Sequence, residues 1–138
     1  MSNGNLSIGC AGAGILGSAI IRRLLESGFS VSVWNRDREK QSPLIDLGAI
    51  PVEAPSELAA AGDLVLTCVT AAAAVEAIVF GDDGVAASGG PQKLLIDMST
   101  RRASRAPWRA VARIRGCCRS FFRRWRVRIF RWRERSPS

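Results

Sequence analysis

The chain has 138 residues, enough for one domain with a single hydrophobic core. Its formal net charge of +8 is unevenly distributed, because residues 1–100 hold 6 Lys and Arg against 11 Asp and Glu, whereas residues 101–138 hold 14 Arg and one Glu. The four cysteines, of which Cys117 and Cys118 are adjacent, and the lack of histidine argue against a zinc site or a disulfide framework. No window has the roughly 18 uncharged apolar residues that a membrane helix needs.

The first elements are a strand, a helix and a second strand. Residues 6–11 (LSIGCA) are a short run of small and apolar side chains, and apolar residues that begin with Ile15 and Leu16 then recur at helical spacing. Gly28 stands where a helix is expected to end. Apolar and polar side chains alternate in residues 29–35, which predicts a strand with one buried face.

The same alternation of strands and helices continues to residue 98. The expected helices cover 38–48 with an interruption near Pro43, 54–62 with Ser56 as the N-cap, and 71–81; the expected strands cover 49–52, 63–69 and 94–98. The apolar run at 63–69 is typical of a central parallel strand that is covered on both faces. The order of elements therefore predicts a doubly wound parallel α/β sheet over residues 1–100.

Gly12, Gly14 and Gly17 form the pattern G-x-G-x-x-G between the first strand and the first helix. In that position the first glycine permits a tight turn, the second leaves room for a pyrophosphate, and the third lets the helix pack closely. The start of the helix presents free N–H groups to the phosphates. The motif predicts a Rossmann-type dinucleotide site; the alternative is a flexible glycine turn.

The end of the second strand bears on which dinucleotide binds. NAD-binding domains usually place Asp or Glu there, whereas this chain has Asn35 followed by Arg36, with Arg38 and Lys40 close behind. A guanidinium attracts a 2′-phosphate and a carboxylate repels it. The segment favours NADP, although Asp37 leaves NAD possible, and the alternative is a solvated helix start of mixed charge.

Several segments together resemble the β-hydroxyacid dehydrogenase family, which includes 3-hydroxyisobutyrate dehydrogenase, glyoxylate reductase and 6-phosphogluconate dehydrogenase. They are IGCAGAGILGSAI, VSVWNRDREK, LGA, DLVLTCVT, AVEAIVFGDDGV and LLIDMST, in order over about residues 6–100. The resemblance implies an NADP-dependent oxidoreductase of small 3-hydroxy acids or short aldehyde acids, of which this chain holds the N-terminal cofactor-binding domain.

The resemblance also implies roles for matching positions. The pyrophosphate would be lined by Gly12, Ala13, Gly14, Ile15 and Leu16. Asn35 and Arg36 would hold the adenosine ribose and its 2′-phosphate. Val69 and Thr70 would lie beside the ribose and diphosphate, and Ser99 near the nicotinamide, as would Thr100. For Thr70 and Ser99 the alternative is capping of the segment that follows, and Asp97 is expected to shape a turn.

The family's general acid and base is a lysine on a helix that follows a sixth strand, and no matching segment is found. The only lysines are Lys40 and Lys93, both before the expected position. Arginine stays protonated and does not replace a lysine in proton transfer. We therefore expect a truncated chain that binds cofactor but is inactive alone, with no catalytic or metal-binding residue of its own.

The segment 101–138 has fourteen arginines and no lysine, with clustered Trp and Cys. Such a bias is typical of a GC-rich gene translated out of register, and a frameshift after Thr100 is our hypothesis. One alternative is a selected basic tail, in which arginines alternate with Trp125, Val127 and Ile129 in a strand-like pattern and bind nucleic acid or an anionic membrane. Another is an interaction arm of a different kind. In the frameshift case the tail is expected to be extended or disordered, leaving the strand at 94–98 with an unpaired edge.

Cys10 and Cys68 lie within apolar runs and are expected to be buried free thiols. The first apolar run follows MSNGN, which has no positively charged leader, so no signal peptide is expected. Both observations fit a reducing cytoplasm.

Overall fold

The computed structural model describes residues 6–88, 94–99, 120–121 and 128–131. Its centre is a sheet in the order β3-β2-β1-β4-β5-β7-β6. The strands are β1 (Ser7–Ala11), β2 (Ser30–Trp34), β3 (Ile50–Pro51), β4 (Leu64–Thr67), β5 (Leu94–Asp97), β6 (Ser120–Phe121) and β7 (Arg128–Arg131). The first five strands run parallel, as the alternation of strands and helices predicted.

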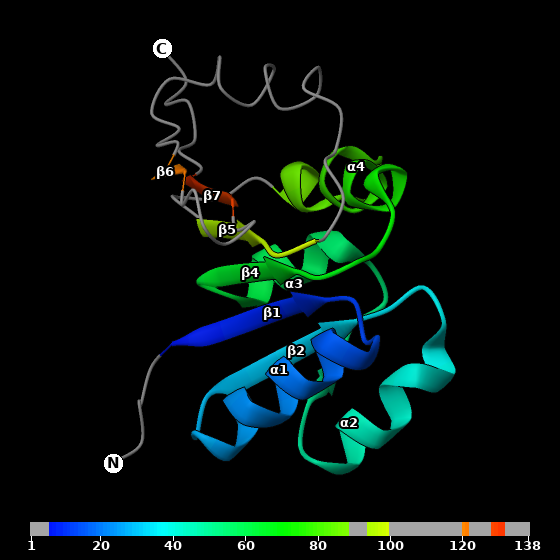
Figure 1. The fold of residues 1–138 in the computed structure, drawn as a ribbon, viewed down its shortest axis with the longest axis vertical. Helices are drawn as coiled ribbons and strands as arrows, with labels where there is room; N and C mark the ends of the chain where they lie inside the picture. Colours follow the sequence, from blue (N-terminus) through cyan, green and yellow to red (C-terminus); the bar gives the residue numbers. More distant parts are fainter. Residues whose placement is uncertain (1–5, 89–93, 100–119, 122–127, 132–138) are drawn as a thin grey trace.

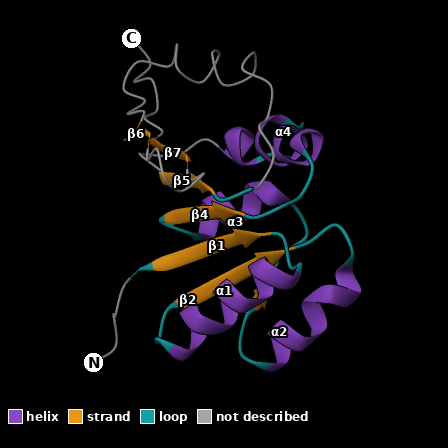
Figure 2. Cartoon of the chain, viewed as in Figure 1, coloured by secondary structure: helices purple, strands orange, loops and turns teal. Residues whose placement is uncertain are grey.

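Helices cover both faces of the parallel strands (Figures 1 and 2). The helical elements are α1 (Ile15–Glu26), η1 (Arg38–Gln41), α2 (Ser42–Asp46), α3 (Pro55–Ala61), α4 (Ala72–Phe80) and η2 (Val85–Ser88), of which η1 and η2 are 3₁₀ turns. Figure 1 shows α1 and α2 together on one face of the sheet and α3 on the other. The doubly wound α/β fold is therefore confirmed. In the part of the chain that the structure describes, no helix is long and apolar enough to cross a membrane.

Two apolar clusters hold the layers together. Beneath α1 and α2, Ile21 and Leu44 pack with Val31 and Val33 of β2, all at most 1% exposed. On the opposite face, Leu58 of α3 and the residues of α4 pack against Val65 of β4. Burial of these side chains is the main stabilising contribution to the domain, at about 25 cal/mol per Å² of apolar surface.

The burial of the side chains of β4 differs from the expected burial. It lies in the middle of the sheet between β1 and β5, as predicted. However, its side chains alternate between intermediate and buried, so Val65 and Thr67 are buried while Leu64 and Leu66 are only partly covered. The apolar run predicted burial on both faces, and among the described residues the helices bury only one face of β4 fully.

The expected cap of α3 is also wrong. Its N-cap is Ala54, which makes no side-chain capping bond, and Pro55 occupies the first helical position, where its missing N–H costs nothing. Ser56 lies within the first turn, and its backbone N–H donates to the carbonyl of Asp83 at 2.9 Å. The Ala-Pro pair thus sets the start of this helix, because proline disfavours helical backbone in the residue before it.

The edge of β5 is paired, contrary to expectation. Strand β7 runs antiparallel to β5, with Leu95 opposite Phe130 and Ile96 opposite Ile129, and β6 pairs with β7. An antiparallel partner occupies the hydrogen-bonding edge that would otherwise favour aggregation. Of the strand-like alternation at Trp125, Val127 and Ile129, only Ile129 lies in β7. The rest of the arginine-rich segment, including its expected disorder, lies outside the described residues apart from β6 and β7.

Candidate functional site

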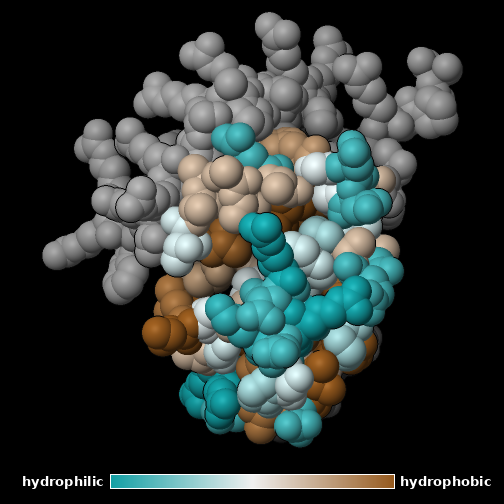
Figure 3. Space-filling model, turned by 90° about the vertical axis from the view of Figure 1, so that its right-hand side faces the viewer, coloured by the Kyte–Doolittle hydropathy of each residue, from teal (hydrophilic) through white to brown (hydrophobic). Residues whose placement is uncertain are grey.

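The carboxyl ends of the parallel strands meet at one edge of the sheet, and the glycine-rich loop lies there between β1 and α1. This edge faces the viewer in Figure 3, where hydrophilic residues gather across the middle of the face. In open parallel sheets, ligands bind in the crevice outside the carboxyl ends of the strands. The loop and the segments after β2, β4 and β5 therefore form the candidate site.

Gly12 makes the turn out of β1 with a φ of 108°, a backbone conformation that side chains disfavour. A Cβ atom at this position would lie 2.1 Å from the carbonyl oxygen of Cys68. The N–H of Gly12 donates to the carbonyl of Trp34 at 2.9 Å, which fixes the turn against β2. The predicted role of Gly12 in a tight turn is thus matched by both backbone angle and space.

The start of α1 is open to a ligand. Gly14 is its N-cap, with no side-chain capping bond, no acidic residue in the first turn, and no atom within 4 Å of the position that a Cβ would take. Ile15 is 97% exposed and Leu16 is 50% exposed. The helical spacing placed both on the apolar face, but they border the open loop instead, and the core contact of this helix is made by Ile21.

Gly17 lies where α1 touches its own loop. A Cβ here would come within 2.3 Å of the carbonyl oxygen of Gly12, so only a hydrogen atom fits between helix and turn. The next residue, Ser18, donates its hydroxyl to the carbonyl of Ala13 at 3.0 Å. Close packing at the third glycine was predicted, and its partner is the loop backbone.

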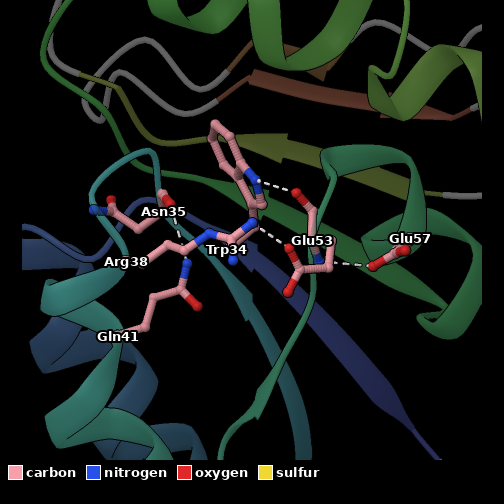
Figure 4. Close-up of polar contacts among 6 residues, drawn as sticks. All are labelled: Trp34, Asn35, Arg38, Gln41, Glu53 and Glu57. Carbon is pink, nitrogen blue, oxygen red and sulfur yellow. Dashed lines mark hydrogen bonds and ion pairs between the residues drawn. The ribbon is translucent and has the colours of Figure 1, made fainter.

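Asn35 fastens the loop to the end of β2. Its Oδ1 accepts the N–H of Ala13 at 2.9 Å, and its Nδ2 donates to the carbonyl of Asp37 at 2.8 Å. Its own carbonyl accepts from Nε2 of the buried Gln41 at 3.0 Å (Figure 4). Asn35 therefore holds the phosphate loop and the segment after β2 in one arrangement, a role that the sequence did not predict. Its contact with a ribose stays a prediction.

The two arginines after Asn35 have different surroundings. Arg38 forms an ion pair with Glu53, on the loop between β3 and α3 (Figure 4). Arg36 is exposed and has no ion pair within the described ranges, which makes its guanidinium available to an anion. Between them, Asp37 accepts the N–H of Glu39 at 3.1 Å and so caps η1.

The ends of β4 and β5 are joined by a buried polar network. Asp97, only 2% exposed, accepts from the hydroxyl of Thr67 and the N–H of Ser99, both at 3.0 Å. The hydroxyl of Ser99 accepts the N–H of Val69 at 3.1 Å. Asp97 thus shapes the turn as predicted, and Ser99 positions the strand end after β4. Thr70 is exposed and does not cap α4, whose N-cap is Ala71.

Both described cysteines are free thiols, as predicted, but only Cys10 is buried, whereas Cys68 is half-buried. Burial, with a smaller effect of Cys68, raises the pKa of the Cys10 thiol to about 12. Burial also raises the pKa of Cys68, and the nearby Asp97 carboxylate raises it further. Both groups are therefore neutral at physiological pH, and their contribution to the site is packing beneath the loop.

Sequence patterns did not single out Ser18, Gln41, Glu53 or Thr67. The side chain of each makes one hydrogen bond or ion pair, either to the backbone or to a side chain distant in sequence. Such partners depend on the distance between segments after folding, and polar side chains of these types are common on helix surfaces and in loops. The glycines, in contrast, were found because their spacing relates to the backbone itself.

Residues 7–114 match the family described as the NAD binding domain of 6-phosphogluconate dehydrogenase. A mitochondrial probable 3-hydroxyisobutyrate dehydrogenase-like 3 of Arabidopsis thaliana is 37% identical over 111 residues, which are 80% of this chain and 35% of the relative. Cytokine-like nuclear factor N-PAC of Xenopus tropicalis is 38% identical over 103 residues, 71% of this chain and 19% of the relative. The chain thus spans about a third or less of these relatives.

Among solved structures, Psf3 in complex with NADP⁺ and 2-OPP superposes with a TM-score of 0.70 at 31% identity. The match covers 83% of this chain and 43% of that one.

Proposed function

Because the chain belongs to the family of NAD-binding domains of 6-phosphogluconate dehydrogenase, we propose that it binds NADP(H) at the carboxyl edge of its sheet. The observation that carries this proposal is the open start of α1, where an uncapped helix end stands behind a loop that is held rigid on both sides. Preorganised N–H groups at a helix N-terminus are a suitable site for a pyrophosphate.

We propose the following contacts, which the positions of the residues support. The N–H groups of Ile15 and Leu16 face the pyrophosphate across the open space at Gly14. Val69 and Thr70 line the edge after β4 on the ribose side, and Ser99 holds that edge in place near the nicotinamide. Asn35 acts on the adenosine end chiefly by holding Ala13 and Asp37.

Arg36 is proposed to bind the 2′-phosphate that distinguishes NADP from NAD. Replacement by alanine is expected to weaken NADPH binding about tenfold or more, since a charge-assisted hydrogen bond is worth about 1.5–3 kcal/mol. NADH lacks this phosphate, so its affinity is expected to stay within about twofold on the same energy scale. Titration of the chain with each cofactor, followed by nucleotide fluorescence, measures both values.

Arg23→Ala is the matched control for Arg36→Ala. Arg23 lies in the last turn of α1, at the end opposite the loop, and pairs with Glu26 at 3.7 Å on an exposed surface. The control removes an equal charge and is expected to leave both cofactor affinities unchanged. Equal losses of NADPH and NADH affinity in Arg36→Ala would contradict the proposed contact with the 2′-phosphate.

We further propose that the 138-residue chain binds cofactor without oxidoreductase turnover. Its two lysines do not fit the catalytic position that the family resemblance implies, because Lys40 follows β2 and Lys93 immediately precedes β5. The purified chain is expected to show no NADPH oxidation above buffer with glyoxylate or succinic semialdehyde, measured by absorbance. Steady oxidation that depends on both chain and substrate would overturn this proposal.

The binding of nucleic acid or an anionic membrane, which the composition of the tail suggested, is not part of this proposal. Most of residues 101–138 lie outside the described part of the chain, and the family match covers residues 7–114. The proposed site consists of residues before 100 and does not depend on the origin of the tail.

A further inference from the structure

Glu53 is held beside the segment that follows β2 by contacts that do not involve its own carboxylate. Its carbonyl accepts from the indole Nε1 of Trp34 at 3.3 Å, and its N–H donates to a carboxylate oxygen of Glu57 at 2.8 Å (Figure 4). The loop between β3 and α3 is thereby fixed against the end of β2. The carboxylate of Glu53 takes part in neither of these backbone contacts, and it forms an ion pair with Arg38.

The ion pair leaves little net positive charge near Arg36. Residues 36–40 carry three cations and two carboxylates, and Glu53 and Glu57 add two further carboxylates, so three positive and four negative charges give a net charge of −1. Arg38 and Glu53 are mostly exposed, with 74% and 70% of their side chains accessible. Their charges therefore act on a bound anion through solvent, and the net charge of the surroundings determines the effect on its affinity.

We propose that Glu53 is a specificity-determining residue that reduces the preference of this site for NADP(H) over NAD(H) by neutralising Arg38. This inference rests on the proposed function, since it concerns the same cofactor site. A 2′-phosphate carries up to two negative charges, whereas the corresponding ribose hydroxyl of NAD is neutral. The Glu53 carboxylate therefore weakens the binding of NADP(H) and leaves the affinity for NAD(H) nearly unchanged. It thus reduces the difference in affinity between the two cofactors that Arg36 creates.

A second arrangement of Arg38 and Glu53 predicts the opposite change in NADPH affinity when Glu53 is replaced. If Glu53 instead held Arg38 in place as a further ligand of the 2′-phosphate, its loss would weaken NADPH binding. The net negative charge of the surroundings favours neutralisation. The two arrangements are distinguished by the direction of the change in NADPH affinity and by the behaviour of a double variant.

The test is Glu53→Gln, which removes the charge and keeps both backbone contacts of this residue. NADPH is expected to bind about three- to fivefold more tightly, because the carboxylate no longer repels the two negative charges of the 2′-phosphate through water-like dielectric. NADH affinity is expected to change by less than about twofold on the same scale. The Kd of each cofactor is measured by fluorescence titration at low salt, where exposed charges are least screened.

The matched control is Glu26→Gln, which removes a carboxylate from another exposed arginine pair at the far end of α1. It is expected to leave both Kd values as in the parent chain. An unchanged melting temperature checks that Glu53→Gln is folded, as expected for an exposed ion pair of small stabilising effect.

The double variant Arg38→Gln/Glu53→Gln restores neutrality and is expected to return the NADPH Kd to the parent value, whereas Arg38→Gln alone weakens it. A double variant as weak as Arg38→Gln alone, or an unchanged or weaker NADPH Kd in Glu53→Gln, would overturn the inference. Failure of the parent chain to bind either cofactor would instead refute the proposed function itself.

Discussion

Replacing Gly14 with valine is expected to lower NADPH and NADH affinity about 100-fold or more while leaving the fold intact. The backbone of Gly14 is extended, with a φ of −73°, and nothing lies within 4 Å of its Cβ position, so the side chain enters open space. That space is where the pyrophosphate is proposed to approach the start of α1. Loss of two charge-assisted hydrogen bonds, each about 1.5–3 kcal/mol, accounts for the size of the effect.

The measurement combines cofactor titration with thermal unfolding followed by circular dichroism. Equal melting temperatures for Gly14→Val and the parent chain are expected, together with the loss of binding to both cofactors. Ala19→Val is the control, since it places the same branched side chain at an exposed position of α1 away from the loop. If Gly14→Val bound NADPH as well as the parent does, the pyrophosphate would not lie over this residue.

The arrangement of strands and helices could be predicted because each element left a local signal. Positive φ angles at Gly28 and Gly48 coincide with the expected ends of the helices that precede them. Alternation in β2 correctly placed Val31 and Val33 on one face. The cap of α3 was wrong because two local rules competed at Pro55, and the preference of proline for the first helical position outweighed the capping tendency of Ser56.

The pairing of β5 with β7 was not predictable in the same way. Antiparallel pairing joins residues more than thirty positions apart, and the charge of the arginine-rich segment suggested repulsion. A free hydrogen-bonding edge at β5 was expected, but composition and periodicity do not show which segment pairs with it. Only the short alternation near β7 indicated that this part of the tail forms a strand.

Within the candidate site, backbone requirements could be predicted and side-chain partnerships could not. The glycine pattern located the tight turn at Gly12, the open start of α1 at Gly14 and the close contact of helix and loop at Gly17. Each has the geometry that the motif requires. The attachment of Asn35 to Ala13 and of Arg38 to Glu53 joins residues 22 and 15 positions apart. These contacts follow from the meeting of strand ends at one edge of the sheet, which is fixed only once the register is known.

Replacing Gly17 with alanine is expected to destabilise the domain by about 3 kcal/mol, because an added methyl group in a closely packed site has no room. The new Cβ would lie 2.3 Å from the carbonyl oxygen of Gly12 and 3.0 Å from its carbonyl carbon, and neither backbone atom can rotate away as a side chain would. The turn cannot move away either, because Gly12 packs directly against the backbone after β4. A Cβ added at Gly12 would lie only 2.1 Å from the carbonyl oxygen of Cys68.

The helix α1 must therefore move off the sheet in Gly17→Ala, and this movement uncovers Ile21, which is 1% exposed in the folded chain. A loss of about 3 kcal/mol lowers the melting temperature by about 10 °C or more in a domain of this size. Gly14→Ala is the matched control, because it adds the same methyl group three residues earlier, where space is open, and it is expected to melt with the parent chain. A melting temperature of Gly17→Ala equal to that of Gly14→Ala would show that α1 does not press on its loop as this structure requires.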